Sequence, residues 1–486
     1  MPLHKITGPA AIVAFSLLAL SACSTVGPDY RVPQQAAINS RAAAEPFAAA
    51  GEAAFSANPL PFQWWRLYDD PLLDELIGKA FAANTDLRVA SANLARARSV
   101  LDEAKTAGTP AVGVSAAPAY GRASAAAKGL SNPLPDAWSF DGGVGVSYQL
   151  DLFGKISRGI EAAGADTEAA QAAYDLTRII VAADTARAYV EACSSGNQLR
   201  VAERSVLLQR QFLQSTEQMT RVGRGTALDL SRARSQYEQR RAALPPLQAQ
   251  RLNALYRLAV LTGQAPGAFV GTLGQCEKTP QLAGPIPVGD GAALLRRRPD
   301  IRQAERLLAT ATARIGVATA DLYPSINLGL SAGSTGLLSQ LGDANAFRWS
   351  LGPLISWTLP DTGSARSRIA QSEAGSAAAL ARFDAAVLNA LRETENALTA
   401  YARELDRNAL LKAARDQSEV ASGQANRLYR YGRADFLTTL DADRTLAADE
   451  SALAASSAKL ASDRIALFLA LGGGWSAEPM PAIKGT

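Results

Sequence analysis

The sequence has almost no histidine and little cysteine, and this scarcity excludes several kinds of active site. Among its 486 residues the only histidine is His4, which lies within an N-terminal targeting signal. Two cysteines, Cys193 and Cys276, remain outside that signal. With so few ligands and bases the chain cannot assemble an HExxH zinc site, a CxxC motif or a Ser-His-Asp triad. The sequence therefore offers no constellation for an enzyme.

Aromatic side chains, net charge and long apolar runs are also sparse. Phe, Trp and Tyr make up 6% of the residues, and the formal net charge is only +4. Because no basic cluster is interleaved with aromatic residues, we expect no nucleic acid partner. After the targeting signal no run of 18 apolar residues occurs, so we expect no transmembrane helix. The abundance of alanine favours helices that pack closely together.

The two remaining cysteines allow two interpretations. Cys193 lies within a helical pattern, where a lone cysteine is usually a small buried residue and not a nucleophile. A disulfide between Cys193 and Cys276 is allowed in an oxidising compartment. The sequence favours the first interpretation and does not decide between them.

The N-terminus has the features of a bacterial lipoprotein signal. A weakly basic start, MPLHK, precedes the apolar stretch AAIVAFSLLAL, and the sequence LSAC then ends at Cys23. LSAC resembles the lipobox, in which the cysteine is acylated and becomes the mature N-terminus, although an ordinary signal peptide is the alternative. Ser24 follows, and not aspartate, which resembles lipoproteins sent to the outer membrane. We therefore expect lipidation at Cys23.

The chain contains one pattern twice. DLRVASANLARARSVLDEAKTAGTPAVGV from Asp86 parallels DIRQAERLLATATARIGVATADLYPSINL from Asp300, 214 residues later. Such self-similarity predicts tandem copies of one structural unit. The expected divisions are a signal peptide at 1–22, an acylated segment at 23–61, a first repeat at 62–264, a linker at 265–290, a second repeat at 291–475 and a tail at 476–486.

Each copy contains two segments in which apolar and polar residues alternate. They predict four strands, at about 110–121, 139–152, 324–333 and 347–359. A half-buried strand of a soluble sheet is one interpretation. Strands of about ten residues with aromatic ends and one small, polar face also fit a transmembrane barrel. Since the smallest such barrels have about eight strands, four strands per chain would require several subunits.

A long segment without proline follows each strand pair and predicts a very long helix. The segment from Gly363 to Tyr431 would span roughly 100 Å at about 1.5 Å per residue. The segment 154–222 has a similar length, with a weak point expected at Gly196 in SSGN. A coiled coil of a structural protein is one interpretation. The broad apolar stripe instead favours helices with neighbours on two sides, as in a wall.

Several motifs in the same order resemble the outer membrane efflux proteins, the TolC-like channels. FQWWRLYDDPLLDELIGKAFAANTDLRVA from Phe62 is similar to the opening of these proteins, and RRRPDIRQAERLLATATARIGVATADLYPSINL from Arg296 is similar to their second-half signature. VGRGTALDL, YGRADFLTTLDADR and LALGGGW also fit. The lipobox and RAALPPLQAQ resemble the NodT-type lipoprotein branch.

The resemblance implies an α+β membrane protein of the outer membrane of a Gram-negative bacterium. In this family three subunits each contribute four strands to one twelve-stranded barrel and long helices to one periplasmic α-helical barrel. The implied function is passive conduction of drugs or other small molecules to the exterior. A periplasmic adaptor and an inner-membrane pump of the resistance-nodulation-division type are the implied partners, besides outer-membrane lipid. No reaction and no cofactor are implied.

The resemblance also gives the two glycine-led stretches a role. Each would turn one helix back into the next at the periplasmic end, with Gly223 and Gly432 at the turns. In members closed at this end, residues at the positions of Leu437 and Asp441 ring the constriction. Three carboxylates on one axis would form a cation-selective ring.

Three further residues would support this gate. Tyr429 and Arg444 would hold it closed through hydrogen bonds and ion pairs. Arg232 stands in the first copy where Asp441 stands in the second, so an Asp441–Arg232 pair between neighbouring helices is possible. The alternative is an ordinary exposed pair of Asp441 and Arg444 on one helix.

Two other functions remain open. A structural or adhesive lipoprotein with a coiled-coil stalk would need no strands. The same channel could also serve type I protein secretion, which only its inner-membrane partner would reveal. In every interpretation Trp64 and Trp65 are expected to pack the N-terminal segment and not to bind a substrate.

Overall fold

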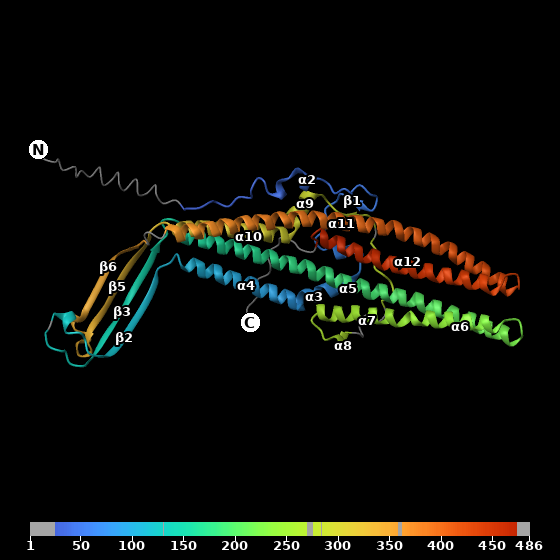
Figure 1. Ribbon diagram of the computed structural model, residues 1–486, viewed down its shortest axis with the longest axis horizontal. Helices are drawn as coiled ribbons and strands as arrows, with labels where there is room; N and C mark the ends of the chain where they lie inside the picture. Colours follow the sequence, from blue (N-terminus) through green and yellow to red (C-terminus); the bar gives the residue numbers. More distant parts are fainter. Residues whose placement is uncertain (1–24, 130, 270–275, 283, 358–361, 474–486) are drawn as a thin grey trace. The chain divides into compact units, whose positions relative to one another are not determined.

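The computed structural model describes residues 25–129, 131–269, 276–282, 284–357 and 362–473 (Figure 1). They form two compact units, each assembled from several stretches of the chain. The first unit comprises Met1–Pro33, Leu94–Ala170 and Gln303–Phe383, and the second comprises Gln34–Asn93, Gln171–Arg302 and Asp384–Thr486, as far as these are described. Cys23, the expected lipidation site, and the expected tail lie outside the described residues.

The first unit contains one antiparallel sheet of four strands (Figure 1). The strands are β2 (Ala111–Gly121), β3 (Ala137–Leu150), β5 (Ser325–Leu337) and β6 (Phe347–Ser356). They lie in the order β2-β3-β5-β6, so β2 and β6 form the edges. Each overlaps one of the four segments expected from the alternating pattern.

The boundaries of β3 differ from the expected 139–152. The strand ends at Leu150 because Asp151 instead caps the helix that follows. Its carboxylate accepts hydrogen bonds from the backbone N–H groups of Ile156 and Ser157, at 2.9 and 2.7 Å. A carboxylate at a helix N-terminus satisfies N–H groups that have no partner within the helix.

The pairing register gives the sheet two chemically different faces. Val144 on β3 lies opposite Val114 on β2 and Ala332 on β5, and Ala332 lies opposite Trp349 on β6. Residues directly opposite one another share a face. This face carries Val112, Val114, Tyr120, Trp138, Val144, Leu328, Leu330, Phe347, Trp349, Leu351 and Ile355, all exposed in the single chain.

The second face of the sheet is small and polar. Ser331 and Ser350 lie opposite each other and are hydrogen bonded at 2.8 Å. Asp141 and Arg348 form an ion pair on the same face. Leu337 and Leu354 are exposed apolar exceptions on this face. The sheet therefore presents a large apolar surface on one side only.

Four helices occur as two pairs of similar length. Helices α4 (Thr85–Thr106) and α10 (Pro299–Ala320) have 22 residues each. Helices α5 (Lys155–Arg221) and α11 (Thr362–Arg430) have 67 and 69 residues. Helix α5 runs without interruption through Gly196, so the expected weak point in SSGN was wrong. Among the described residues, no helix is both long and apolar enough to cross a membrane.

The helices that follow differ between the two halves of the chain. Helix α12 (Phe436–Ala470) is continuous, whereas its counterpart is divided into α6 (Ala227–Ala242) and α7 (Leu244–Leu261). Pro245 lies in the first turn of α7. Proline is tolerated there because the first N–H groups of a helix have no intrahelical partner, but it cannot continue a preceding helix.

Short elements complete the second unit. Strands β1 (Phe55–Ser56) and β4 (Ile286–Pro287) form a parallel pair. The remaining helices are α2 (Arg41–Ala44), α3 (Pro71–Ala83), α8 (Pro266–Phe269) and α9 (Gly291–Arg297), with short 3₁₀ turns such as Trp64–Tyr68.

The main hydrophobic core lies in the second unit and includes both expected tryptophans. Trp64 is fully buried and stacks on Phe468 of α12, with ring centroids 4.6 Å apart. Trp65 is also buried, and its indole N–H donates a hydrogen bond of 2.8 Å to Asp74 of α3. Both side chains pack the N-terminal segment, as expected.

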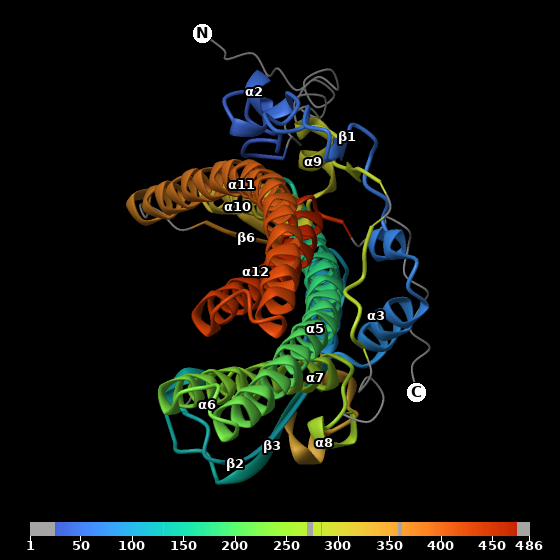
Figure 2. The ribbon, with the colours of Figure 1, turned by 90° about the vertical axis from the view of Figure 1, so that its right-hand side faces the viewer.

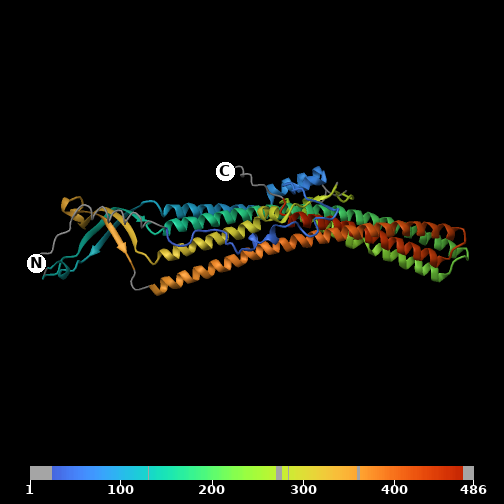
Figure 3. The ribbon, with the colours of Figure 1, turned by 90° about the horizontal axis from the view of Figure 1, so that it is seen from above.

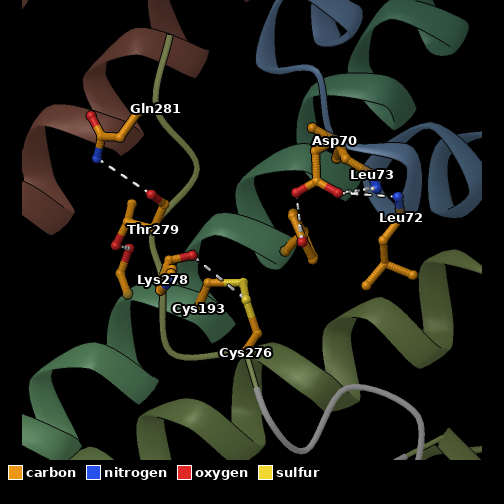
Figure 4. Close-up of a disulfide and its surroundings, with 10 residues drawn as sticks. Asp70, Leu72, Leu73, Cys193, Cys276, Lys278, Thr279 and Gln281 are labelled. Atoms are coloured by element: carbon orange, nitrogen blue, oxygen red, sulfur yellow. Dashed lines mark hydrogen bonds between the residues drawn. A yellow bond between two sulfur atoms is a disulfide. The ribbon is translucent and has the colours of Figure 1, made fainter.

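The two cysteines form a disulfide, contrary to the favoured interpretation. Cys193 of α5 is joined to Cys276, with Cα atoms 4.7 Å apart, and the Cys193 side chain is fully buried (Figure 4). The bond ties the segment after α8 to the middle of α5. Nearby, Ser194 Oγ and Thr279 Oγ1 lie 3.3 Å apart, so a hydrogen bond also joins the two segments.

Candidate functional site

Two helical hairpins in the second unit carry the glycine-led turns. Helix α5 lies beside α6, and α11 lies beside α12, each pair joined by a short loop (Figures 1 and 3). Figure 2 shows both hairpins from their loop ends. The candidate site consists of these loops and of the residues between the hairpins.

Gly223 and Gly432 end α5 and α11 with the same backbone geometry. Their φ angles are +74° and +71°, the left-handed region that side chains disfavour. The N–H groups of Arg224 and Arg433, one residue later, each donate a hydrogen bond of 2.8 Å to the carbonyls of Met219 and Leu428. This bonding pattern is a Schellman motif, which satisfies carbonyls at the end of a helix.

The helices that leave the two turns begin with matching caps. The Thr226 hydroxyl accepts a hydrogen bond from the Asp229 N–H, and the Asp229 carboxylate accepts one from the Thr226 N–H, which forms a capping box for α6. Asp435 caps α12 by accepting a hydrogen bond of 2.7 Å from the Thr438 N–H. Both loops thus have defined ends, so each turn fixes the direction of the following helix.

An aromatic cluster joins the two hairpins close to the turns. Phe212 of α5 packs against Phe436 of α12 and Tyr429 of α11, with ring centroids 5.3 and 6.3 Å apart. Ala233 of α6 and Leu440 of α12 belong to the same buried cluster. Tyr429, an expected gate residue, is therefore packed between helices, and burial raises the pKa of its hydroxyl.

The other expected gate residues lie on the surface of the single chain. Leu437 is 51% exposed, and Asp441 and Arg444 are exposed on the same side of α12. Arg232 of α6 is also exposed. Within the described part of the chain, Asp441 forms no ion pair with Arg232 or Arg444. Both side chains are exposed in the single chain, so an Asp441–Arg232 pair between neighbouring helices stays a prediction.

Asp443, which was not singled out from the sequence, makes the interhelical contacts instead. Its Oδ1 atom accepts hydrogen bonds from Ser422 Oγ at 2.6 Å and from Asn426 Nδ2 at 2.8 Å, both on α11. Burial raises the pKa of the Asp443 carboxyl, and these two hydrogen bonds oppose the increase. Counting helical turns from the buried Phe436 and Leu440 would have placed Asp443 on the inner face.

Two further charged groups face the same region. Burial lowers the pKa of the Arg240 guanidinium on α6, and Arg444 lowers it further. Burial also raises the pKa of the Glu450 carboxyl on α12. Both groups lie in the lining of one cavity together with Asp443. Among the described residues, no group of three or more His, Cys, Asp and Glu residues could hold a metal ion.

Comparison with known proteins gives consistent matches over almost the whole chain. The profile of the family described as "Outer membrane efflux protein" matches residues 76–264 and 292–473. Nodulation protein T of Rhizobium leguminosarum bv. trifolii is 28% identical over 471 residues, covering 95% of this chain and 96% of that protein. The antibiotic efflux pump outer membrane protein ArpC of Pseudomonas putida is 29% identical over 481 residues, covering 95% of each chain.

A solved structure matches equally well. The outer-membrane channel OprN superimposes with a TM-score of 0.87 and 36% sequence identity, covering 93% of this chain and 100% of that chain. The similarity in sequence and structure thus extends through both hairpins and the sheet.

Proposed function

We propose that this chain, which belongs to the outer membrane efflux protein family, works as a homotrimer. The chain is the outer-membrane channel of a tripartite efflux pump and not an enzyme. Each trimer would passively conduct drugs or other toxic small molecules from the periplasm to the exterior. Members of the family work with an inner-membrane pump and a periplasmic adaptor, and we propose a pump of the resistance-nodulation-division type here.

The proposal rests on the four-stranded sheet, which has one apolar face and one polar face. One face is apolar and exposed, while the other carries serine, glycine and charged residues. A barrel in lipid needs an apolar outer face and a polar lumen, and its edges must be closed because lipid cannot satisfy backbone N–H and C=O groups. The edges β2 and β6 would pair with neighbouring subunits, which gives twelve strands in a trimer.

We further propose that Cys23 carries the lipid anchor and that the residues following it are held close to the sheet. In the first unit the Val26 N–H donates to the Phe153 carbonyl at 3.1 Å, just after β3. Arg158 donates to the carbonyls of Val26 and Gly27, each at 3.2 Å. Because Thr25 follows Cys23 by only two residues, the tether between lipid and sheet would be short.

The anchor has a direct test. Mass spectrometry of the mature N-terminus should find acyl chains on Cys23 and no residues before it. In a Cys23→Ala variant the lipid should be absent and the signal should escape the lipoprotein-processing pathway. An unmodified Cys23 in the wild type would refute lipidation without affecting the proposed channel, because the barrel would insert through its own apolar face.

The exposed face of α12 supports a gate at the trimer axis. Among the described residues Leu437, Asp441 and Arg444 are left exposed, so neighbouring subunits could bring three copies together. Three Asp441 carboxylates would repel one another, and the nearby Arg444 side chains would reduce that repulsion. The turns at Gly223 and Gly432 would then lie at the periplasmic mouth.

The conducting function is tested with purified protein in a planar lipid bilayer. We expect discrete single-channel currents, a trimeric mass in mild detergent, and loss of resistance to at least one toxic small molecule when the gene is deleted. A stable monomer without conductance would refute the channel trimer. Resistance that is unchanged, together with loss of an exported protein, would favour type I secretion through the same channel.

A further inference from the structure

A cavity of about 720 Å³ lies between the two hairpins of the second unit. Its lining comes from all four helices, α5, α6, α11 and α12. Binding sites for small molecules commonly have volumes of about 300–1,000 Å³. The cavity is therefore large enough for an organic ligand.

The apolar part of the wall is formed mainly by α5. Leu208, Phe212 and Met219 of α5 line the cavity, and Leu446 of α12 faces them. Phe212 belongs to the aromatic cluster described above, so its ring is held by Phe436 and Tyr429. A flat or branched apolar group could pack against this wall at little entropic cost, because the wall is already ordered.

A buried amide in the same wall lacks a hydrogen-bond partner. Gln209 is only 8% exposed, and its Nε2 atom donates no hydrogen bond to any described residue. Buried polar groups are nearly always hydrogen bonded, and an unpaired donor costs free energy. Gln209 lines the cavity. An acceptor atom within the cavity would remove this cost.

The charged groups of the lining balance one another. Arg240 and Arg430 carry positive charges, and Asp443 and Glu450 carry negative charges. Within the described residues, the side chains of Arg240 and Glu450 make no hydrogen bond and no ion pair, whereas Asp443 is bonded to α11. A ligand with a net charge would gain no net Coulombic attraction from such a lining.

We propose that this cavity is a binding site for a neutral amphipathic molecule that carries a carbonyl or hydroxyl oxygen. Its apolar body lies against Phe212 and Leu446, and its oxygen accepts a hydrogen bond from Gln209. Asp443, Leu446 and Glu450 lie on a different side of α12 from Leu437, Asp441 and Arg444. The site therefore lies between the hairpins and on another side of α12 from these three gate residues, while Tyr429 lines its wall, and binding can be measured without conductance.

Occupancy would couple the two hairpins. A molecule that contacts α5 and α6 as well as α11 and α12 binds only while the hairpins lie together. It must therefore stabilise that arrangement by its binding free energy. A ligand of this site would thus reduce the frequency of any opening that separates the hairpins.

The test uses three probes with one common ring: neutral 4-bromoacetanilide, anionic 4-bromobenzoate and cationic 4-bromobenzylammonium. Binding to the full-length protein in lipid nanodiscs is measured by calorimetry, because detergent molecules share the proposed ligand chemistry. We expect saturable binding of the neutral probe, at least tenfold weaker binding of both charged probes, and a bromine anomalous peak between the hairpins in crystals.

Two substitutions separate this site from unspecific binding. Gln209→Met keeps the side-chain length and removes the amide, and it should weaken binding of 4-bromoacetanilide at least fivefold. Gln214→Met on an exposed position of the same helix is the matched control and should leave binding unchanged. No binding of any probe, preference for a charged probe, or equal effects of the two substitutions would overturn the proposal.

Discussion

The backbone of Gly196 in α5 packs closely against the backbone carbonyl of Cys276. A Cβ atom at position 196 would stand 2.3 Å from that oxygen, which is closer than any real contact. The disulfide between Cys193 and Cys276 holds the segment in this position. The glycine in SSGN therefore does not interrupt the helix; it allows another segment to cross the helix closely.

Gly196→Ala should lower the free energy of unfolding by about 1–3 kcal/mol, because the added methyl forces α5 and the segment at Cys276 apart. Alanine is the better helix former by about 1 kcal/mol, so helix propensity alone predicts the opposite sign. Gly164→Ala on the same helix has open space at its Cβ and is the control. Equal stabilisation of both variants in urea unfolding would contradict the close approach.

Gly432→Ala should destabilise the turn after α11 by about 1 kcal/mol, because residue 432 has a φ angle of +71°. Gly423→Ala, nine residues earlier within α11, should instead stabilise the protein by about 0.5–1 kcal/mol. At neither position does a described atom outside the local backbone lie within 4 Å of an added Cβ, so only the backbone angle differs. Thermal unfolding of both variants decides whether the left-handed turn is needed.

Leu351→Arg should impair membrane insertion, since an arginine on the lipid face of a barrel costs about 2–4 kcal/mol near the bilayer centre. Ser350→Arg is the matched control, because it lies one residue earlier on β6 and on the polar face. Folding yield into lipid vesicles should fall for Leu351→Arg only. A reversed order would mean that the two faces of the sheet are assigned incorrectly.

The double variant Leu437→Ala, Asp441→Asn should raise single-channel conductance and weaken cation selectivity, because it widens the proposed constriction and removes its charge. Each contact is worth about 1 kcal/mol at most in water, so single substitutions should have small effects. The control is Leu410→Ala with Asp406→Asn, an exposed pair with the same spacing on α11. Unchanged currents in the first variant would place the gate elsewhere.

Asp443 should make stability depend on pH in a defined direction. Burial raises the pKa of this carboxyl above 3.8, so in the window above pH 3.8 the folded protein binds more protons than the unfolded chain. The contribution of Asp443 to stability must therefore fall as pH rises through that window. Asp443→Asn keeps an acceptor oxygen for Ser422 and Asn426 but removes this titration.

The measurement is the difference in the free energy of unfolding between the wild type and Asp443→Asn across pH 3.5 to 7. Ser422→Ala removes one hydrogen bond that lowers the pKa of Asp443, so it should extend the window to higher pH. A difference that does not change with pH would mean that Asp443 is solvated in the folded protein.

Local patterns in the sequence were sufficient for much of this structure. Alternation with a period of two identified the strands and their faces, because successive side chains of a strand point to opposite sides. The helical pattern that ends just before Gly223 and just before Gly432 marked the extent of α5 and α11 to within a residue or two. Gly223 and Gly432 identified the turns, since a positive φ angle strongly favours glycine. Each of these features depends on a few neighbouring residues.

Other features were decided only by the tertiary structure. The pairing of Cys193 with Cys276 spans 83 positions, and no local pattern reports which segments meet across such a distance. Asp441 and Asp443 are the same residue type two positions apart, but α11 packs against Asp443 and hydrogen bonds to it, whereas Asp441 is exposed. The sequence predicted a weak point at Gly196, because it does not show that the segment at Cys276 packs against this position. Which distant segments of the chain come into contact depends on the packing of the whole unit. The roles of these residues therefore could not be assigned from their sequence neighbours alone.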